Sequence, residues 1–355
     1  MRTILTTTGT SLLTNTAREL NKKAASVTDE ELRHFFEQVG AAKASAETNS
    51  LLKIAEKDDE IVLLYTTTIE GERCAKIVQQ YLQNQNWKFI RLVQLPLEQN
   101  EAQFERHGLR ELVNILVDEI TKATNQGREV IINATGGFKA EIAYTTMVGM
   151  IFQVPVKYIY QDFSQPINFP VLPITWNIDF LLEYEPFFKW ITSDYRTQLE
   201  LEQRLKAIPD RERILGMLLP PDVDNYIFLS PAGEILWRRV IQQQQAAEIV
   251  AEPSVSEIPI SEKISSSVKS VKHHYPQGTL KFAENLAQLA FVESVIGGHF
   301  ENTTMRRIKS VNDDGSIRLL WADNQKAVNI TVQTTARGQV QTLKVCDFIR
   351  PLLDA

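Results

Sequence analysis

The stretch "INATGGFKAEIAY" (residues 132–144) decides how the first half of this sequence is interpreted. It follows "REVII" (128–132), an apolar run rich in β-branched residues, and leads into "AEIAYTTMVGMIF" (140–152), which reads as a helix. The two glycines therefore lie in a strand-to-helix turn. Such a turn can need glycine for a positive φ. Alternatively, it can bind phosphate through backbone N–H groups, with Lys139 adding a positive charge.

Strands and helices alternate on both sides of this turn. Strand-like runs occupy residues 3–8, 60–68, 88–96, 128–137 and 154–161. Helical patterns separate them at residues 10–20, 28–56, 70–85 and 110–127, and from Lys139 onward. This alternation predicts an α/β fold with a doubly wound, mostly parallel sheet.

Three of the predicted strands end in small or hydroxyl-bearing residues. The three ends are "TTTGTS" (6–11), "TTT" (66–68) and "NATGG" (133–137). Ligands of doubly wound sheets bind beyond the carboxyl ends of the strands. Because three such ends are harder to explain by turn chemistry than one, the sequence predicts a site for a polar ligand there.

The second half of the chain changes character. Residues 181–240 are expected to form a small interdomain element of helix and strand. The following segment, 241–272, is rich in Gln, Ser and Glu and contains no aromatic residue. It is therefore predicted to be a flexible linker. Residues 273–355 are expected to form a small α+β domain.

Within that last domain, residues 278–300 are expected to form one helix or a helical pair that closes at Gly297–Gly298. Three strand-like runs follow, "MRRIKSV" (305–311), "SIRLLWAD" (316–323) and "KAVNITVQTT" (326–335). The turns "NDDG" and "DNQ" join them into an antiparallel sheet.

Composition narrows the class of protein. Of the 355 residues only two are cysteines, and the net charge is −6. This argues against a disulfide framework or a cysteine-based zinc site and fits a reducing cytoplasm. The histidines have no metal-ligand spacing, so no metal is expected. No signal peptide or membrane-spanning run is recognised, and no membrane partner is expected.

Two motifs give the first half a family resemblance. "TTTGTSLLTN" (6–15) and "NATGGFKAE" (133–141) resemble CARF domains, the CRISPR-associated Rossmann-like sensors, over residues 1–180. The resemblance implies a homodimer that binds a cyclic oligoadenylate, usually cyclic tetra-adenylate, and no cofactor. The implied ligand contacts are Thr10, Ser11, Asn133, Thr135, Gly136, Gly137, Phe138 and Lys139.

Residues 273–355 resemble RelE-type ribonuclease toxins in their order of helices and three strands. The resemblance implies an endoribonuclease that binds mRNA in the ribosome and stabilises the developing phosphorane charge with cations. The implied catalytic residues are Arg307, Lys309, Arg318 and Arg337. The sequence departs from the family in having no clear acid or base near its end. The substitutes considered are His273, His274, Tyr275 and His299.

Three functions follow from these resemblances. The first is an effector of CRISPR defence, in which the second messenger activates the ribonuclease tail. The second is a ring nuclease that degrades its own ligand, with Ser11 and Lys139 at the scissile phosphate. The third is a regulator whose tail binds without cutting. The predicted linker and the cations of the tail favour the effector, because a ring nuclease needs no tethered second domain.

Overall fold

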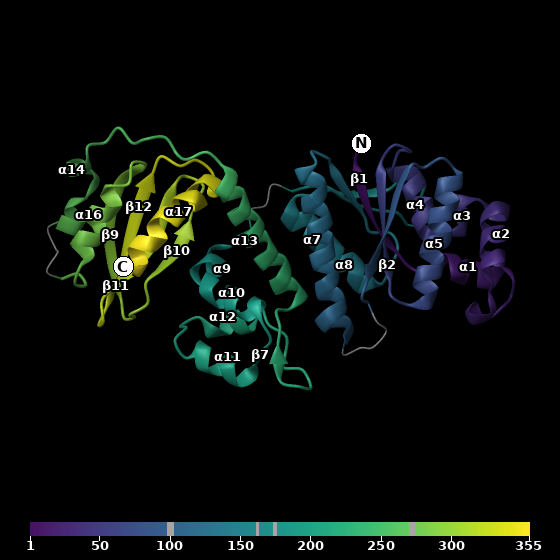
Figure 1. The fold of residues 1–355 in the computed structure, drawn as a ribbon, viewed down its shortest axis with the longest axis horizontal. Helices are drawn as coiled ribbons and strands as arrows, with labels where there is room; N and C mark the ends of the chain where they lie inside the picture. Colours follow the sequence, from purple (N-terminus) through teal and green to yellow (C-terminus); the bar gives the residue numbers. More distant parts are fainter. Residues whose placement is uncertain (98–102, 161–162, 173–175, 270–273) are drawn as a thin grey trace. The chain divides into compact units, whose positions relative to one another are not determined.

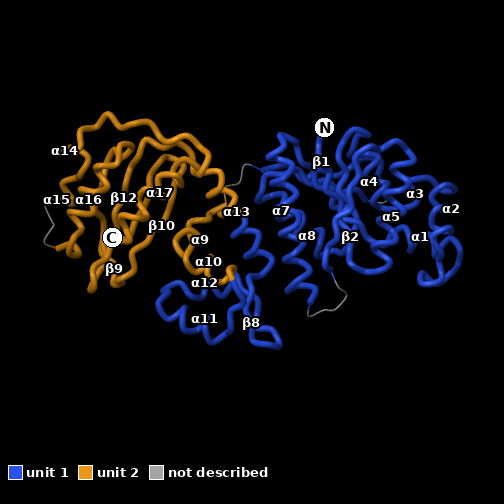
Figure 2. Tube along the Cα trace, in the orientation of Figure 1, with its two compact units in different colours: residues 1–175, 194–238 blue, residues 176–193, 239–355 orange. Residues whose placement is uncertain are grey.

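The computed structural model describes residues 1–97, 103–160, 163–172, 176–269 and 274–355. It contains two compact units (Figure 2). Unit 1 consists of residues 1–175 and 194–238, and unit 2 of residues 176–193 and 239–355. The units interleave along the chain, whereas the expected domains were consecutive segments. The division into functional domains at 180, 240 and 272 stays a prediction.

Unit 1 contains a six-stranded sheet in the order β3-β2-β1-β4-β5-β6. All neighbouring strands are parallel except β5 and β6, which are antiparallel. The strands are β1 (Thr3–Thr8), β2 (Glu60–Thr66), β3 (Phe89–Leu95), β4 (Val130–Asn133), β5 (Val156–Tyr158) and β6 (Ile167–Phe169). The predicted mostly parallel sheet is confirmed, and β6 is an edge strand that the sequence did not indicate.

Helices cover both faces of this sheet (Figure 1). One apolar core joins β1 and β2 to the helices on one side, which include α1, α2, α4 and α5, while α7 and α8 lie on the other side. The helices of this part are α1 (Ser11–Glu19), η1 (Ala24–Ser26), α2 (Asp29–Val39), α3 (Ala41–Ala44), α4 (Ala46–Ile54), α5 (Ile69–Asn84), the π-helical η2 (Phe104–Leu109), α7 (Arg110–Asn125) and α8 (Lys139–Phe152).

The central strand β1 shows why a threonine-rich run forms a strand here. Every residue of its sequence "TILTTT" is buried. Strands of a parallel sheet are covered on both faces, and β-branched side chains pack well on a pleated surface. The hydroxyls of Thr3, Thr7 and Thr8 donate to oxygen atoms nearby, whereas that of Thr6 has no partner among the described residues.

Residues 194–238 complete unit 1 with short elements. Strands β7 (Arg196–Thr197) and β8 (Tyr226–Ile227) pair antiparallel, and the helices between them are α11 (Gln198–Leu205) and α12 (Arg211–Leu215). Helix α13 (Pro231–Ile249) follows. It continues into the segment 241–272, so the expectation that this whole segment is a flexible linker is wrong. Glutamine and alanine, abundant in "QQQQAAEI", are good helix formers.

Unit 2 contains a four-stranded antiparallel sheet in the order β10-β11-β12-β9. The strands are β9 (Val292–Glu301), β10 (Arg307–Val311), β11 (Ser316–Ala322) and β12 (Ala327–Thr334). Its helices are α9 (Asp179–Glu183), α10 (Glu185–Ser193), α14 (Ile260–Lys263), α15 (Ser266–Lys269), α16 (Thr279–Ala287) and α17 (Gln339–Asp354). The α+β arrangement and both hairpins of the tail are confirmed.

One element of the tail differs from the prediction. Residues 292–301 form strand β9 instead of the end of a helix, and α16 stops at Ala287. The two glycines allow close packing, not a helix cap: a Cβ on Gly297 would lie 2.5 Å from the hydroxyl of Tyr275, and one on Gly298 would lie 3.3 Å from the carbonyl oxygen of Asn329. The tail therefore has four strands between α16 and α17.

Across the described ranges, every helix is too short or too polar to span a lipid bilayer.

Candidate functional site

The loops after β1 and β4 meet at one edge of the unit 1 sheet. The two strands are neighbours, with Thr6 opposite Asn133. The hydroxyl of Thr7 donates to the carbonyl oxygen of Gly136 at 2.6 Å, and a Cβ on Gly9 would lie 3.2 Å from the backbone nitrogen of Gly137. The structure thus brings together two of the three strand ends that the sequence singled out.

The third strand end has a different role. Thr68 caps helix α5 by accepting from the backbone N–H of Gly71 at 3.1 Å, and its hydroxyl lies 2.9 Å from that of Thr66. These hydroxyls satisfy each other and the start of a helix, which is the ordinary function of threonine at such a position.

A buried glutamate on α4, which was not among the predicted site residues, holds the first loop. Glu47 is 1% exposed, and it accepts hydrogen bonds from the backbone N–H of Gly9 at 2.8 Å and from the hydroxyl of Ser11 at 2.7 Å. Ser11 also accepts from the backbone N–H of Ala46 at 3.0 Å. The predicted ligand contact Ser11 therefore has partners on α4 that fix its hydroxyl.

A second buried glutamate lies under the other loop. Glu141 is 1% exposed, and the backbone N–H of Phe138 donates to its carboxyl group. Burial, opposed by the Phe138 N–H and assisted by the charge of the nearby Glu47, raises the pKa of Glu141 to about 7. Within the described part of the chain, its Oε1 has no hydrogen-bond partner.

These two carboxyl groups explain the glycine pair of the turn. A Cβ on Gly136 would lie 2.6 Å from Oε1 of Glu47 and 2.6 Å from the carbonyl oxygen of Thr7, and a Cβ on Gly137 would collide with Glu141. Gly137 also has φ of +95°, which a residue with a side chain rarely adopts. The turn interpretation is thus correct, and buried acids add a second reason for both glycines.

The side chains of Asn133 and Thr135 also face inward. Asn133 is fully buried and donates to the hydroxyl of Ser50 at 2.8 Å. Thr135 donates to the side-chain oxygen of Asn133 at 2.7 Å and accepts from the backbone N–H of Ile159 at 3.1 Å. They fix the β4 loop to α4 and to the end of β5, so any direct contact with a ligand would have to compete with these bonds.

The outer part of the turn is open to an anion. Gly137, Phe138 and Lys139 are exposed, whereas Thr10 and Ser11 are half-buried. Phe138 is the N-cap of α8 without a side-chain cap, and no described residue forms an ion pair with Lys139. Backbone donors at the start of a 14-residue helix beside an unneutralised lysine favour a phosphate.

Two of the four predicted tail cations are neutralised. Arg307 Nε lies 2.7 Å from Oε1 of Glu183, and the two side chains are 9% and 11% exposed. Lys309 Nζ lies 2.6 Å from Oε1 of Glu301. Arg307 is therefore held inside unit 2, while the less buried Lys309 is tied to the last residue of β9, the strand at the opposite edge of the sheet.

Arg318 and Arg337 are exposed and differ in position. Arg318 lies on β11 opposite Ser310, with its Nε 3.3 Å from that hydroxyl. It shares a sheet face with Arg307, which pairs with Leu320 two residues further along β11. From the sequence, Arg337 was expected to end the third strand-like run. This expectation is wrong, because β12 already stops at Thr334. Arg337 lies in the loop before α17.

The four residues considered as a catalytic acid or base of the tail do not share one location. Tyr275 is buried and packs on Phe300 with ring centroids 5.4 Å apart, while His299 lies within β9. His274 contributes its carbonyl oxygen to a bond from Lys326. His273 lies outside the described residues.

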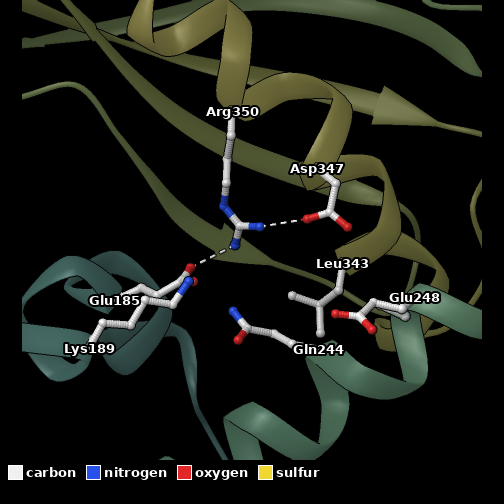
Figure 3. A pocket seen from close by; sticks show the side chains of 8 residues that line it. Glu185, Lys189, Gln244, Glu248, Leu343, Asp347 and Arg350 are labelled. Atoms are coloured by element: carbon white, nitrogen blue, oxygen red, sulfur yellow. Dashed lines mark hydrogen bonds and ion pairs between the residues drawn. The ribbon is translucent and has the colours of Figure 1, made fainter. Parts of the chain in front are cut away.

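Unit 2 also contains a charged cavity of about 130 Å³ (Figure 3). Arg350 lies 2.7 Å from Glu185 and 2.6 Å from Asp347, and Lys189 also pairs with Glu185. Burial opposes ionisation of Glu185, but Arg350 and Lys189 outweigh it and lower its pKa. The charges neutralise one another, so the cluster joins α10 to α17 and offers little to an anionic substrate.

The fold of unit 1 is Rossmann-like α/β, a class that places ligands at the loops described above. Residues 42–172 match the family model described as CRISPR-associated protein (Cas_APE2256). This match includes the turn at 133–139 and Glu47, and it ends before unit 2 begins.

Two solved structures resemble the chain at a greater distance. Can2 from Sulfobacillus thermosulfidooxidans in complex with cyclic tetra-adenylate has 13% identity and a TM-score of 0.26, covering 94% of this chain and 77% of that one. Protein VC1899 from Vibrio cholerae has 9% identity and a TM-score of 0.28, covering 99% of this chain and 85% of that one. Similarity at these scores supports no inference about activity.

Proposed function

We propose that unit 1 senses a cyclic oligoadenylate, such as cyclic tetra-adenylate, and thereby controls an endoribonuclease formed by the tail. The observation that carries the proposal is the convergence of the loops after β1 and β4, which leaves Lys139 and the start of α8 open to a phosphate. The match of residues 42–172 to a CRISPR-associated family supports the same reading.

The ligand's symmetry requires two copies of the chain. A cyclic tetra-adenylate has a two-fold axis, so two turns related by that axis can each bind half of the ring. Exposed apolar side chains around the end of β5 and strand β6 support a homodimer: Tyr160, Phe163, Ile167, Phe169, Val171 and Leu172.

The proposed enzyme is a RelE-like mRNA interferase that acts on the ribosome. Its support is the antiparallel sheet of unit 2, on which Arg307, Lys309 and Arg318 occupy the neighbouring strands β10 and β11. Cations directed at one phosphate stabilise the charge that develops during cleavage. Because Arg307 and Lys309 are ion-paired, Arg318 and Arg337 are assigned the larger share of this role.

One assay tests both parts. Purified protein is mixed with cyclic tetra-adenylate, and both the ring and an mRNA are followed with and without ribosomes. The proposal expects ring binding and ring-dependent mRNA cleavage. Ring degradation without mRNA cleavage would replace the effector by a ring nuclease, and binding without any cleavage would replace it by a regulator. Absence of binding to every cyclic oligoadenylate would overturn the sensor itself.

A further inference from the structure

Unit 2 has a second cavity, of about 380 Å³, that none of the predictions used. It lies at one end of the sheet, between α16, the end of β11 and the last residues of α17. The side chains that matter for its chemistry are Lys281, Phe282, Asn285, Arg306, Trp321 and Asn324.

A stack of flat groups forms one wall of this cavity. Phe282 and Trp321 are stacked with ring centroids 4.2 Å apart and planes 13° apart, and the guanidinium carbon of Arg306 lies 3.8 Å from the Trp321 ring centroid. Two groups this close to one ring cannot share a face. The indole is therefore sandwiched, and the guanidinium is the outer layer of the stack.

Two backbone carbonyl groups fix Arg306 in this orientation. Its Nε donates to the carbonyl oxygen of Ala322 at 2.8 Å, and its Nη1 donates to that of Leu353 at 3.0 Å. No described carboxylate pairs with it. Arg306 is exposed, unlike its neighbour Arg307, which is paired with Glu183. A guanidinium held flat and unneutralised presents both a stacking plane and free N–H donors.

The remaining wall adds charge and amides. Lys281 and Asn285 lie four residues apart on α16, so they project from the same side of the helix. Both are exposed. The one acidic side chain of the wall, Asp323, accepts from the backbone N–H groups of Lys326, Gln277 and Gln325, which lower its pKa. Its negative charge is thus taken up by backbone donors of its own loop and of the residues before α16.

We infer that this cavity binds a ribonucleotide, with the base stacked on the outer face of the Arg306 guanidinium and the phosphate near Lys281. Bases of single-stranded RNA stack on arginine planes and aromatic side chains in this way. Asn285 and Asn324 supply donors and acceptors for the edge of the base. The ribonucleotide is either a free nucleotide or one residue of an RNA strand.

This inference goes beyond the proposed function, since binding here requires neither a cyclic ligand nor cleavage. It is tested with the full-length protein by isothermal titration. The probes are guanosine 5′-monophosphate, guanosine, inorganic phosphate and a short single-stranded RNA without adenine, which avoids the proposed sensor. Binding of the RNA alone identifies a strand as the source, and binding of the mononucleotide alone identifies a free nucleotide.

The variants separate stacking from charge. Arg306→Ala should weaken nucleotide binding about tenfold or more, and Arg306→Lys should fail to restore it, because lysine keeps the charge but not the plane. Lys281→Ala should weaken binding of the nucleotide but not of guanosine. Since Lys281 is exposed, this variant tests the site even if Arg306→Ala folds poorly. Lys344→Ala, which removes a cation outside the cavity, should bind like the wild type.

Three results would overturn the inference. The first is no binding of any nucleotide or RNA probe. The second is equal affinity for inorganic phosphate and the nucleotide, which would mean an anion site without base stacking. The third is wild-type affinity for the nucleotide in both single variants, Arg306→Ala and Lys281→Ala.

Discussion

The buried carboxyl groups at the candidate site of unit 1 and those beside the sheet of unit 2 have different kinds of partner. In unit 1, Glu47 and Glu141 accept hydrogen bonds from uncharged donors, namely backbone N–H groups and a serine hydroxyl. In unit 2, Glu183 pairs with Arg307, and Glu185 pairs with Arg350 and Lys189. Uncharged donors shape a loop without involving any cation. Paired carboxylates instead neutralise the cations that a nucleic acid would need.

The difference changes how much each predicted cation can contribute. Lys139 follows the two glycines that pack on buried acids and yet has no described ion pair, so its charge is available to a ligand. Arg307 stands on the expected sheet face but is buried against Glu183. Whether a cation can bind a ligand therefore depends less on its position in the sequence than on whether the fold places a carboxylate beside it.

The largest loss of stability is expected when the buried ion pair of unit 2 is broken. Arg307→Ala leaves the carboxylate of Glu183 buried without a partner, which should lower the free energy of unfolding by about 3–5 kcal/mol. Hydrogen exchange of unit 2 peptides measures the loss. Wild-type protection in this variant would show that the pair does not hold unit 2 together.

A double variant separates structure from catalysis. Arg307→Leu combined with Glu183→Leu replaces the pair by apolar side chains and should recover most of the stability. If the double variant is stable and still cuts mRNA, Arg307 acts only in the fold. If it is stable and inactive, Arg307 has a catalytic role in addition to its ion pair.

The next largest effect is expected on mRNA cleavage, when one of the two exposed tail cations is removed. Arg318→Ala and Arg337→Ala should each lower ligand-dependent mRNA cleavage by about 10²–10³-fold, if each charge stabilises the developing oxyanion. Neither should change the free energy of unfolding by more than about 0.5 kcal/mol. Lys344→Ala is the matched control and should cut normally. Wild-type rates in both arginine variants would make the tail a binding module and ring nuclease the leading function.

The same contrast explains what the sequence could and could not reveal. The strands of unit 1 were predictable because buried, β-branched runs alternate with helical patterns. Strand β9 was not, because "AENLAQLAFVESV" reads as one continuous apolar pattern although the helix stops at Ala287. Helix α13 was missed since glutamine-rich composition suggests a linker as readily as a helix.

Of the site residues that were not predicted, one had a local signal in the sequence and the others did not. Glu141 had a local signal: it is the third residue of α8, a position from which a glutamate can reach back to the N-cap N–H. Glu47 had none, because it lies 36 residues from Ser11. Glu183 lies 124 residues from Arg307. Only the fold could bring these pairs together.

A smaller effect, on ligand affinity, is expected when the unpaired Lys139 of unit 1 is replaced. Lys139→Ala should weaken binding of cyclic tetra-adenylate roughly tenfold to a hundredfold, because a charge-assisted hydrogen bond contributes about 1.5–3 kcal/mol. Stability should not change, since the side chain is exposed. Titration of the ring against wild type and variant measures this, with Lys88→Ala as a control, since Lys88 is an exposed cation paired with Asp58 elsewhere in unit 1. Equal affinity would remove the phosphate from this turn.

The smallest effect is a pH dependence that separates the two kinds of buried acid. The pKa of Glu141 is raised from 4.5 to about 7, so the folded protein holds this proton more tightly than the unfolded chain. Its contribution to stability is therefore complete below pH 4.5 and is lost as the pH rises toward 7 and above. Between pH 5.5 and pH 7 the loss should be roughly 1–2 kcal/mol.

Glu141→Gln tests this assignment because glutamine keeps the shape of the protonated acid and does not titrate. The difference in urea-unfolding free energy between wild type and variant should move by that amount over the same pH range, in favour of the variant at the higher pH. Glu185 supplies the contrasting case: its pKa is lowered, so its contribution is present above its ordinary pKa and is lost on acidification. A constant difference between wild type and Glu141→Gln from pH 5.5 to pH 7 would mean that Glu141 is ionised in the folded protein, and the two sites would then differ only in the partners of their acids.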